Sequence, residues 1–189
     1  MRIDVPLGKA YLLLNHGPVT LVTSRSGERT NVMAASWAMP LDFDPPKVVV
    51  VIDRETLTRE LVGESREFAL NIPPRELADS VVAVGSRSGR DGDKWAGEGL
   101  ATLPADRIGA PLVDGCIAWL ECRLLEERDV ERKYDLFIAE VVAASADDRV
   151  FSGGRWHFDD PALKTVHYVA GGQFFTIGDP VTGRTGRPG

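Results

Sequence analysis

Two segments of this chain carry residue types that could bind a small molecule. Residues 30–46, TNVMAASWAMPLDFDPP, place small side chains between two apolar stretches, which leaves backbone amides uncovered for a flat ligand with polar edges. Residues 86–94, SRSGRDGDK, combine serine hydroxyls, glycines and cationic side chains. Consecutive amides in a glycine-containing turn can form a concavity for an anion, and arginine or lysine adds charge. Together the two segments predict one site for a molecule with an aromatic head and an anionic tail.

Each segment also has a simpler interpretation. Residues 31–37 alternate as a β-strand does, and the predicted faces carry Val32, Ala34 and Ser36 on one side and Asn31, Met33, Ala35 and Trp37 on the other. This could be an ordinary core strand that is rich in alanine. Residues 86–94 could be a solvated turn whose acids and bases neutralise each other. The spacing GxxxxGK[ST] does not occur in the sequence, so the loop is not of the Walker type.

Composition limits the class of partner. The chain has 189 residues with 43% hydrophobic content, which is enough for one domain with a conventional core. Its net charge of −6 argues against a nucleic-acid-binding surface, because such affinity depends on clustered lysine and arginine. A small basic loop in an acidic protein is better suited to one phosphate than to a polymer. Residues 179–189, DPVTGRTGRPG, have almost no apolar side chains and predict a flexible tail.

The sequence also predicts where the protein works. The apolar run AYLLL near the N-terminus is too short for a signal peptide or a membrane span, so we expect a cytoplasmic protein without membrane contact. Cys116 and Cys122 lie in one predicted strand, roughly 20 Å apart at about 3.3 Å per residue. A disulfide needs Cα atoms within about 7 Å, so two free cysteines in a reducing compartment are expected. No cysteine and histidine spacing suggests a metal, and none is predicted.

Short β-branched segments between turn residues predict antiparallel strands rather than βαβ units. The predicted strands are residues 19–24, 31–36, 47–52, 67–71, 116–128 and 134–144, with turns at 25–29, 42–46 and 129–133. The strand at 116–128 is expected to be half-buried, with Trp119, Glu121 and Arg123 on the face away from the core.

Helices and a last hairpin complete the predicted fold. Thr56 or Thr58 can cap a short helix that runs through Gly63, and Pro73-Pro74 can open another. Residues 166–170 and 173–177 predict a hairpin across Gly171-Gly172. A closed antiparallel barrel with inserted helices accounts for this order.

In this order the segments resemble the flavin-reductase-like, FMN-binding split-barrel family, which includes the flavoredoxins. The matching stretches are PVTLVTSRSGERTNVMAASW at 18–37, FDPPKVVVVID at 43–53, SREFALNIP at 65–73, SGRDGDKWAG at 88–97 and HYVAGGQFF at 167–175. No single stretch is diagnostic, but their joint occurrence is specific. The resemblance implies a mainly β fold with inserted α-helices, a six-stranded antiparallel Greek-key split barrel over residues 1–178. It also implies non-covalent FMN and a homodimer with the cofactor near the subunit interface.

The resemblance assigns roles to matching positions. Those implied to line the flavin ring and its chain are Asn31, Met33, Ala34, Ala35, Ser36 and Trp37. Those implied to approach the ribityl phosphate are Asp53, Thr56, Thr58, Ser86, Ser88, Gly89, Arg90 and Lys94. His167 and Tyr168 are implied to lie near the redox face, from the same subunit or its partner. A histidine there could position a nicotinamide or stabilise reduced flavin, and the alternative for His167 is a core-edge side chain bonded to a backbone carbonyl.

One departure from the family affects affinity. Many relatives carry threonine after the methionine of this strand, whereas this chain has Ala34. The missing hydroxyl could remove one neutral hydrogen bond, which contributes about 0.5–1.5 kcal/mol. The sequence therefore leaves two alternatives, tightly held FMN and exchangeable FMN.

The implied function is an FMN-dependent NAD(P)H:flavin reductase, in which NADH or NADPH delivers hydride to the flavin. The alternatives are a flavoredoxin-like electron-transfer protein reduced by a protein donor, and a flavin-less ligand-binding barrel. A monooxygenase or an electron-transfer protein is an expected partner.

Overall fold

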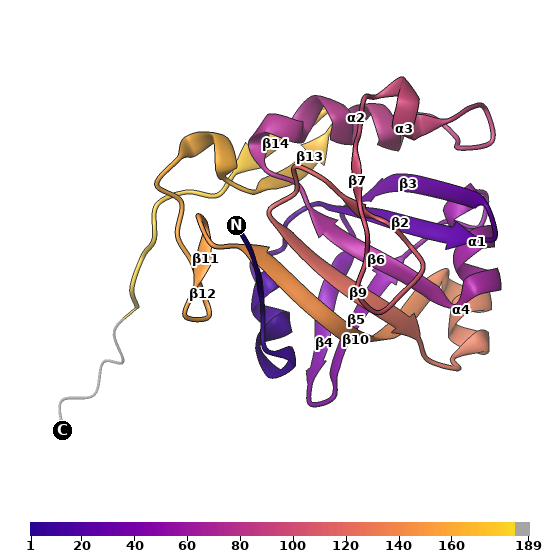
Figure 1. The fold of residues 1–189 in the computed structure, drawn as a ribbon, viewed down its shortest axis with the longest axis horizontal. Coiled ribbons are helices and arrows are strands. Elements are labelled where there is room, and N and C mark those ends of the chain that lie inside the picture. The colour runs from indigo at the N-terminus through magenta and orange to yellow at the C-terminus, as the bar shows by residue number, and fades with distance from the viewer. Residues whose placement is uncertain (184–189) are drawn as a thin grey trace.

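The computed structural model describes residues 1–183, which fold around a large antiparallel sheet (Figure 1). The strands are β1 (Arg2–Asp4), β2 (Thr20–Ser26), β3 (Arg29–Ala35), β4 (Ala38–Phe43), β5 (Pro46–Val51), β6 (Glu67–Ile72), β7 (Thr102–Leu103), β8 (Leu112–Val113), β9 (Ala118–Leu124), β10 (Leu136–Asp147), β11 (Phe151–Ser152), β12 (Arg155–Trp156), β13 (Val166–Ala170) and β14 (Gln173–Thr176). The α-helices are α1 (Leu57–Ser65), α2 (Ala78–Ser86), α3 (Lys94–Gly97) and α4 (Arg128–Tyr134). Short 3-10 helices are η1 (Leu7–Leu13), η2 (Arg75–Leu77) and η3 (Pro161–Leu163).

The main sheet has eight strands in the order β3-β2-β6-β9-β10-β5-β4, with β1 paired to β10. The predicted mainly β, antiparallel architecture is confirmed, but the predicted count of six strands is too low. The additional strands are β1 and β4. Strand β4 extends into the predicted turn at 42–46, because it pairs with β5 as far as Phe43 and Pro46. The turn between the two strands is therefore shorter than predicted. Pro40 argues against a strand in the sequence, because proline occurs in sheets mainly in edge strands, and β4 is such an edge strand.

Strand β9 is covered on both faces from Ala118 to Cys122, so the prediction of a half-buried strand is wrong there and correct only at Arg123, which is exposed. Trp119 is 4% exposed and Glu121 is 3% exposed. The Trp119 indole donates a hydrogen bond to the Val113 carbonyl at 2.9 Å. The Glu121 carboxylate accepts from the backbone amides of Asp106 and Arg107 at 2.9 and 2.6 Å. The loop that contains Asp106 and Arg107 therefore covers this face of β9. Such cover could not be predicted, because backbone amides that bind a carboxylate leave no periodic pattern in the sequence.

The helices follow their predicted capping residues. Thr56 caps α1 by accepting a hydrogen bond from the Arg59 amide at 3.2 Å, and the helix runs two residues beyond the predicted Gly63. A 3-10 turn and α2 follow Pro73-Pro74, as predicted. Residues 129–133, predicted as a turn, belong to α4.

The hairpin of β13 and β14 is confirmed. Gly171 and Gly172 have φ values of 57° and 80°, which suit the two-residue turn that joins such strands. This hairpin lies beside α2 at the same end of the molecule (Figure 1).

Two further expectations concern the cysteines and the tail. Cys116 and Cys122 are free and buried, as predicted, and burial raises the pKa of both thiols. The predicted flexible tail, residues 179–189, lies outside the described residues from position 184 onward. The division into a domain at 1–178 and a tail stays a prediction. Within residues 1–183, no helix has the length and apolar character needed to cross a membrane.

Candidate functional site

The predicted site segments meet at the free edge of β3. This strand ends the sheet path, so it has a strand neighbour on one side only, β2. Alternate residues of such a strand direct their N–H and C=O groups away from the neighbour. The Lys94 ammonium donates to the Val32 carbonyl at 3.0 Å. By the same alternation, the main-chain groups of Ala34 also point outward, where a ligand could bind them.

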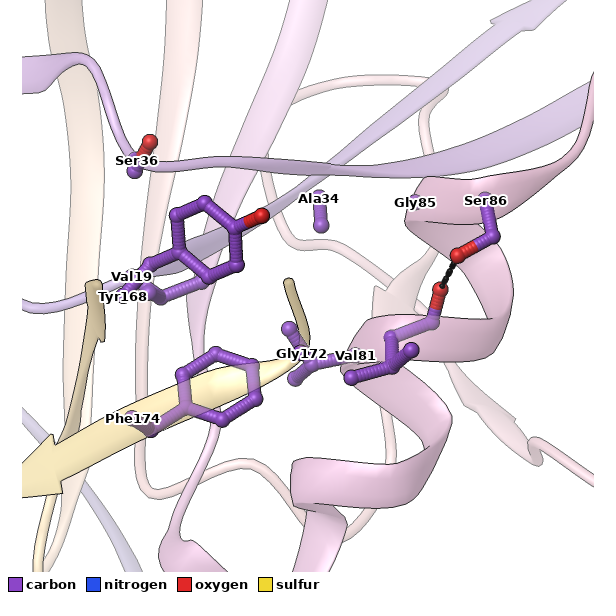
Figure 2. A pocket seen from close by; sticks show the side chains of 10 residues that line it. Val19, Ala34, Ser36, Val81, Gly85, Ser86, Tyr168, Gly172 and Phe174 are labelled. Atoms are coloured by element: carbon purple, nitrogen blue, oxygen red, sulfur yellow. Dashed lines mark hydrogen bonds between the residues drawn. The ribbon is translucent and has the colours of Figure 1, made fainter. Parts of the chain in front are cut away.

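One hollow lies between this edge, α2 and the β13–β14 hairpin, and we call it the hairpin hollow. Its volume is about 230 Å³, and its lining residues are Val19, Ala34, Ser36, Val81, Val82, Gly85, Ser86, Tyr168, Gly172 and Phe174. Figure 2 shows the rings of Tyr168 and Phe174 on one side and residues of α2 on the other. The two rings meet edge to face, with centroids 5.6 Å apart. The hollow therefore offers aromatic and small apolar surface beside a polar strand edge.

A second hollow adjoins the first, and we call it the loop hollow because the 86–94 loop forms much of its wall. Its volume is about 250 Å³, and its lining residues are Asn31, Met33, Ala34, Glu55, Thr56, Leu57, Val84, Gly85, Ser86, Arg87, Ser88, Gly89 and Lys94. Both hollows share Ala34, Gly85 and Ser86. Ligand pockets typically span roughly 300–1,000 Å³. Each hollow alone is smaller than that, whereas the two together fall within the range.

Lys94 supplies a buried cation to the loop hollow. The residue is 4% exposed, and its ammonium donates to the carbonyl oxygens of Val32 and Val84 at 3.0 and 2.7 Å. It forms no ion pair with any residue of the described chain. Burial, with a contribution from Arg87, lowers the pKa of Lys94 to about 8. An ammonium has three donors, so one remains for a ligand, and an anion in the hollow would offset the cost of burying the charge.

Asn31 links β3 to α1, and the 86–94 loop approaches its side chain closely at Gly89. The Asn31 amide donates to the Thr58 hydroxyl at 2.8 Å, and Thr58 is fully buried behind it. A Cβ atom at Gly89 would overlap the Asn31 side chain, so only glycine allows the loop this close to the strand. Thr58 therefore positions Asn31 and does not itself line a hollow.

Other predicted residues lie outside both hollows. Arg90 is exposed, and its guanidinium donates to Glu60 at 2.7 Å. Asp53 accepts from the Glu55 amide at 2.8 Å and shapes the turn before α1. Trp37 is 73% exposed, and Ala35 is buried in the main core on the other face of β3.

The hollows also contain residues that the sequence prediction did not select. Arg87 lines the loop hollow and pairs with Glu98 at 3.0 Å. Its place in the basic loop was the signal that could have found it. Gly85 and Phe174 had no such signal, because their role depends on how α2 and the hairpin pack against β3.

His167 lies outside both hollows. Its Nδ1 donates to the Gly17 carbonyl at 2.9 Å. Successive side chains on a strand point to opposite faces, so His167 points away from the face where Tyr168 lines the hairpin hollow. This is the geometry of a core-edge histidine bonded to the backbone.

Comparison with known proteins places this site in a family context. A family model described as "Flavin reductase like domain" matches residues 13–165. The chain is 45% identical over 183 residues to the protein YddH of Escherichia coli (strain K12), covering 95% of this chain and 97% of that protein. It resembles the crystal structure of an FMN-binding domain of a flavin reductases-like enzyme from Shewanella baltica OS155, with a TM-score of 0.95 and 43% identity over 97% of this chain and 98% of the other. Flavoredoxin of Desulfovibrio vulgaris (Miyazaki F) shares the fold, with a TM-score of 0.78 and 24% identity over 90% and 91% of the two chains.

Proposed function

The chain belongs to the flavin reductase like domain family, and from this premise we propose that it is an FMN-binding NAD(P)H oxidoreductase. The observation that carries the proposal is the pair of joined hollows at the β3 edge. One is apolar and partly aromatic, and the other contains a buried lysine without a carboxylate partner in the described chain. An FMN molecule has a planar ring at one end and a phosphate at the other, which matches this division.

The residues present fit that cofactor. Tyr168, Phe174 and Ala34 would contact the ring, and the outward main-chain groups of β3 would bind its polar edge. Lys94 and Ser88, with Thr56, would hold the phosphate. The relation to the Shewanella baltica domain, whose description names FMN binding, supports the same cofactor.

The protein's contribution would be binding and electrostatics. Bound FMN would supply the redox chemistry, accepting hydride from NADH or NADPH and passing electrons to free flavin or another acceptor. Fixed N–H donors at the β3 edge stabilise negative charge on a ligand because they need no reorganisation. Lys94 would neutralise the phosphate, and the hairpin would shield one side of the ring from water.

We also propose a homodimer that packs through β4. This edge strand and the residue before it expose a row of large apolar side chains, Trp37, Met39, Leu41 and Phe43. Contiguous exposed apolar surface of this kind is typical of an interaction site. Trp37 follows Ser36, which lines the hairpin hollow, so a partner on this surface would lie beside the cofactor site.

The test of the function is spectroscopic. Purified protein is mixed with FMN, freed of excess ligand and titrated anaerobically with NADH and with NADPH. The proposal expects flavin absorbance that bleaches with at least one nicotinamide. Bleaching only with dithionite or a reduced ferredoxin would instead indicate a flavoredoxin-like carrier. A colourless protein that FMN does not stabilise against heat would indicate a flavin-less barrel, because a ligand of the native state must raise its stability.

A further inference from the structure

A third hollow lies away from the flavin site, and we call it the Trp156 hollow. Its volume is about 380 Å³, and its lining residues are Leu12, Asn15, His16, Gly154, Arg155 and Trp156. None of these residues lines the hairpin hollow or the loop hollow. We propose that this hollow binds a small planar carboxylate, of the class of aromatic acids.

Arg155 provides the charge for such a ligand. It stands at the start of β12, beside the tight turn of Gly153 and Gly154, whose φ values are 57° and 77°. Across residues 1–183 it makes no ion pair, and the residues that line the hollow include no acid. A guanidinium binds a carboxylate through two parallel hydrogen bonds. Arg155 is therefore the one charged residue of the arginine, lysine, aspartate and glutamate types in the described lining, which favours an anionic ligand over a cationic one.

Trp156 provides a fixed aromatic wall. Its indole N–H donates to the Leu12 carbonyl at 2.9 Å, and its ring stacks on Phe158 with centroids 5.4 Å apart. The His16 ring meets it edge to face at 5.2 Å. Burial lowers the pKa of His16 to about 4, so this wall is uncharged at neutral pH. The hollow thus joins two rigid rings to one cation, which suits a ring that carries a carboxylate.

Hydrogen bonds connect this hollow to the hairpin. His16 Nε2 and the Thr165 hydroxyl are 3.1 Å apart, and that hydroxyl is 3.4 Å from His167 Nε2. His167 Nδ1 donates to the Gly17 carbonyl, so His16, Thr165 and His167 form one hydrogen-bonded chain from the hollow to β13. A ligand beside His16 would change its surroundings, so the imidazole signals of His16 and His167 report occupancy.

The experiment titrates FMN-saturated protein with benzoate and, in parallel, with the neutral analogue benzamide. Calorimetry gives the affinity, and histidine side-chain NMR gives the location. Arg155→Gln removes the charge at an exposed position, and Arg132→Gln is the matched control, because Arg132 is also exposed and lies on α4. A hydrogen bond to a charged group contributes about 1.5–3 kcal/mol. Arg155→Gln should therefore weaken benzoate at least about tenfold, while Arg132→Gln should leave it unchanged.

The results separate this site from the flavin site. Support requires saturable benzoate binding with shifted His16 and His167 signals, and weaker binding of benzamide. Equal benzoate affinity in Arg155→Gln and wild type, equal affinity for the two probes, or no saturation would each overturn the proposal. Arg155 lines neither flavin hollow, so FMN binding by Arg155→Gln should match wild type. A protein that binds benzoate but not FMN would refute the proposed function alone.

Discussion

At the scale of single residues, the site depends on which cation is buried. Lys94 and Arg90 are four residues apart in the same loop, yet Lys94 lies inside the loop hollow while Arg90 bonds Glu60 at the surface. The sequence predicted both as phosphate ligands, because composition does not show which side chain will meet an acid 30 positions away.

Lys94→Met should weaken FMN by at least about tenfold and riboflavin much less, because a charge-assisted bond contributes about 1.5–3 kcal/mol and only FMN carries the phosphate. Fluorescence quenching titrations with both flavins measure the difference. Methionine has a similar volume, and riboflavin binding checks that the site still folds. Arg90→Ala is the control and should change FMN affinity little. Equal losses of FMN affinity in the two variants would contradict this assignment, because they would show that Arg90 breaks its bond to Glu60 and binds the phosphate itself.

The pKa of Lys94 also predicts a pH dependence. FMN affinity should fall as the pH rises through about 8, where the free protein's Lys94 loses its proton, whereas riboflavin affinity should stay level. A pKa below the ordinary 10.5 means that the folded state holds the proton less tightly than the unfolded state. This residue's contribution to stability therefore rises between about pH 8 and 10.5 in the free protein. Titrations from pH 6.5 to 9.5 test the point, and parallel curves for both flavins would contradict it.

At the scale of elements, the β3 edge brings the site together, and sequence patterns located that edge well. Alternation and β-branched residues placed β2, β3, β5 and β6 within one or two residues of their observed bounds. Strand β4 was not predicted, because it contains Pro40 and its large apolar side chains are exposed. The contributions of α2 and of the β13–β14 hairpin to the hollow were not predicted, because they depend on packing against β3 by elements that lie more than 40 and more than 130 residues after it in the chain. The sequence therefore predicted the wall of the site that β3 forms, but not the wall that α2 and the hairpin form.

The close approach of the loop to β3 makes Gly89 sensitive to substitution. Gly89→Ala would drive a methyl group into the Asn31 side chain, so the loop must move away from the strand. The thermal midpoint should fall by a few degrees, since overpacking costs about 1–3 kcal/mol, and FMN affinity should fall with it. Gly63→Ala is the control: it lies in α1 with open space around it and should hold or raise stability. Unchanged FMN affinity in Gly89→Ala would remove the loop from the binding site.

At the scale of the whole molecule, the two ends of the sheet path have different roles. The β3 end carries the hollows under α2 and the hairpin, and the β4 end exposes apolar side chains. The short link between β3 and β4 connects the two regions through Ser36 and Trp37. A partner subunit on β4 would therefore help to enclose the proposed FMN site.

The dimer proposal predicts the effect of one surface substitution. Trp37→Ser should shift the protein from dimer toward monomer in sedimentation velocity, because it removes the most exposed large side chain of the β4 row. Val181→Ser, which alters an apolar residue that is 92% exposed elsewhere, should sediment as wild type. A wild-type protein that stays monomeric at micromolar concentration, or a dimer unaffected by Trp37→Ser, would contradict this interface.

The most direct test is a crystal structure of the protein with FMN. We expect the ring between Tyr168 and α2 in the hairpin hollow, the phosphate within hydrogen-bond distance of Lys94 in the loop hollow, and the connecting chain across Ala34 and Gly85. FMN bound elsewhere, or bound with its phosphate remote from Lys94, would contradict the account.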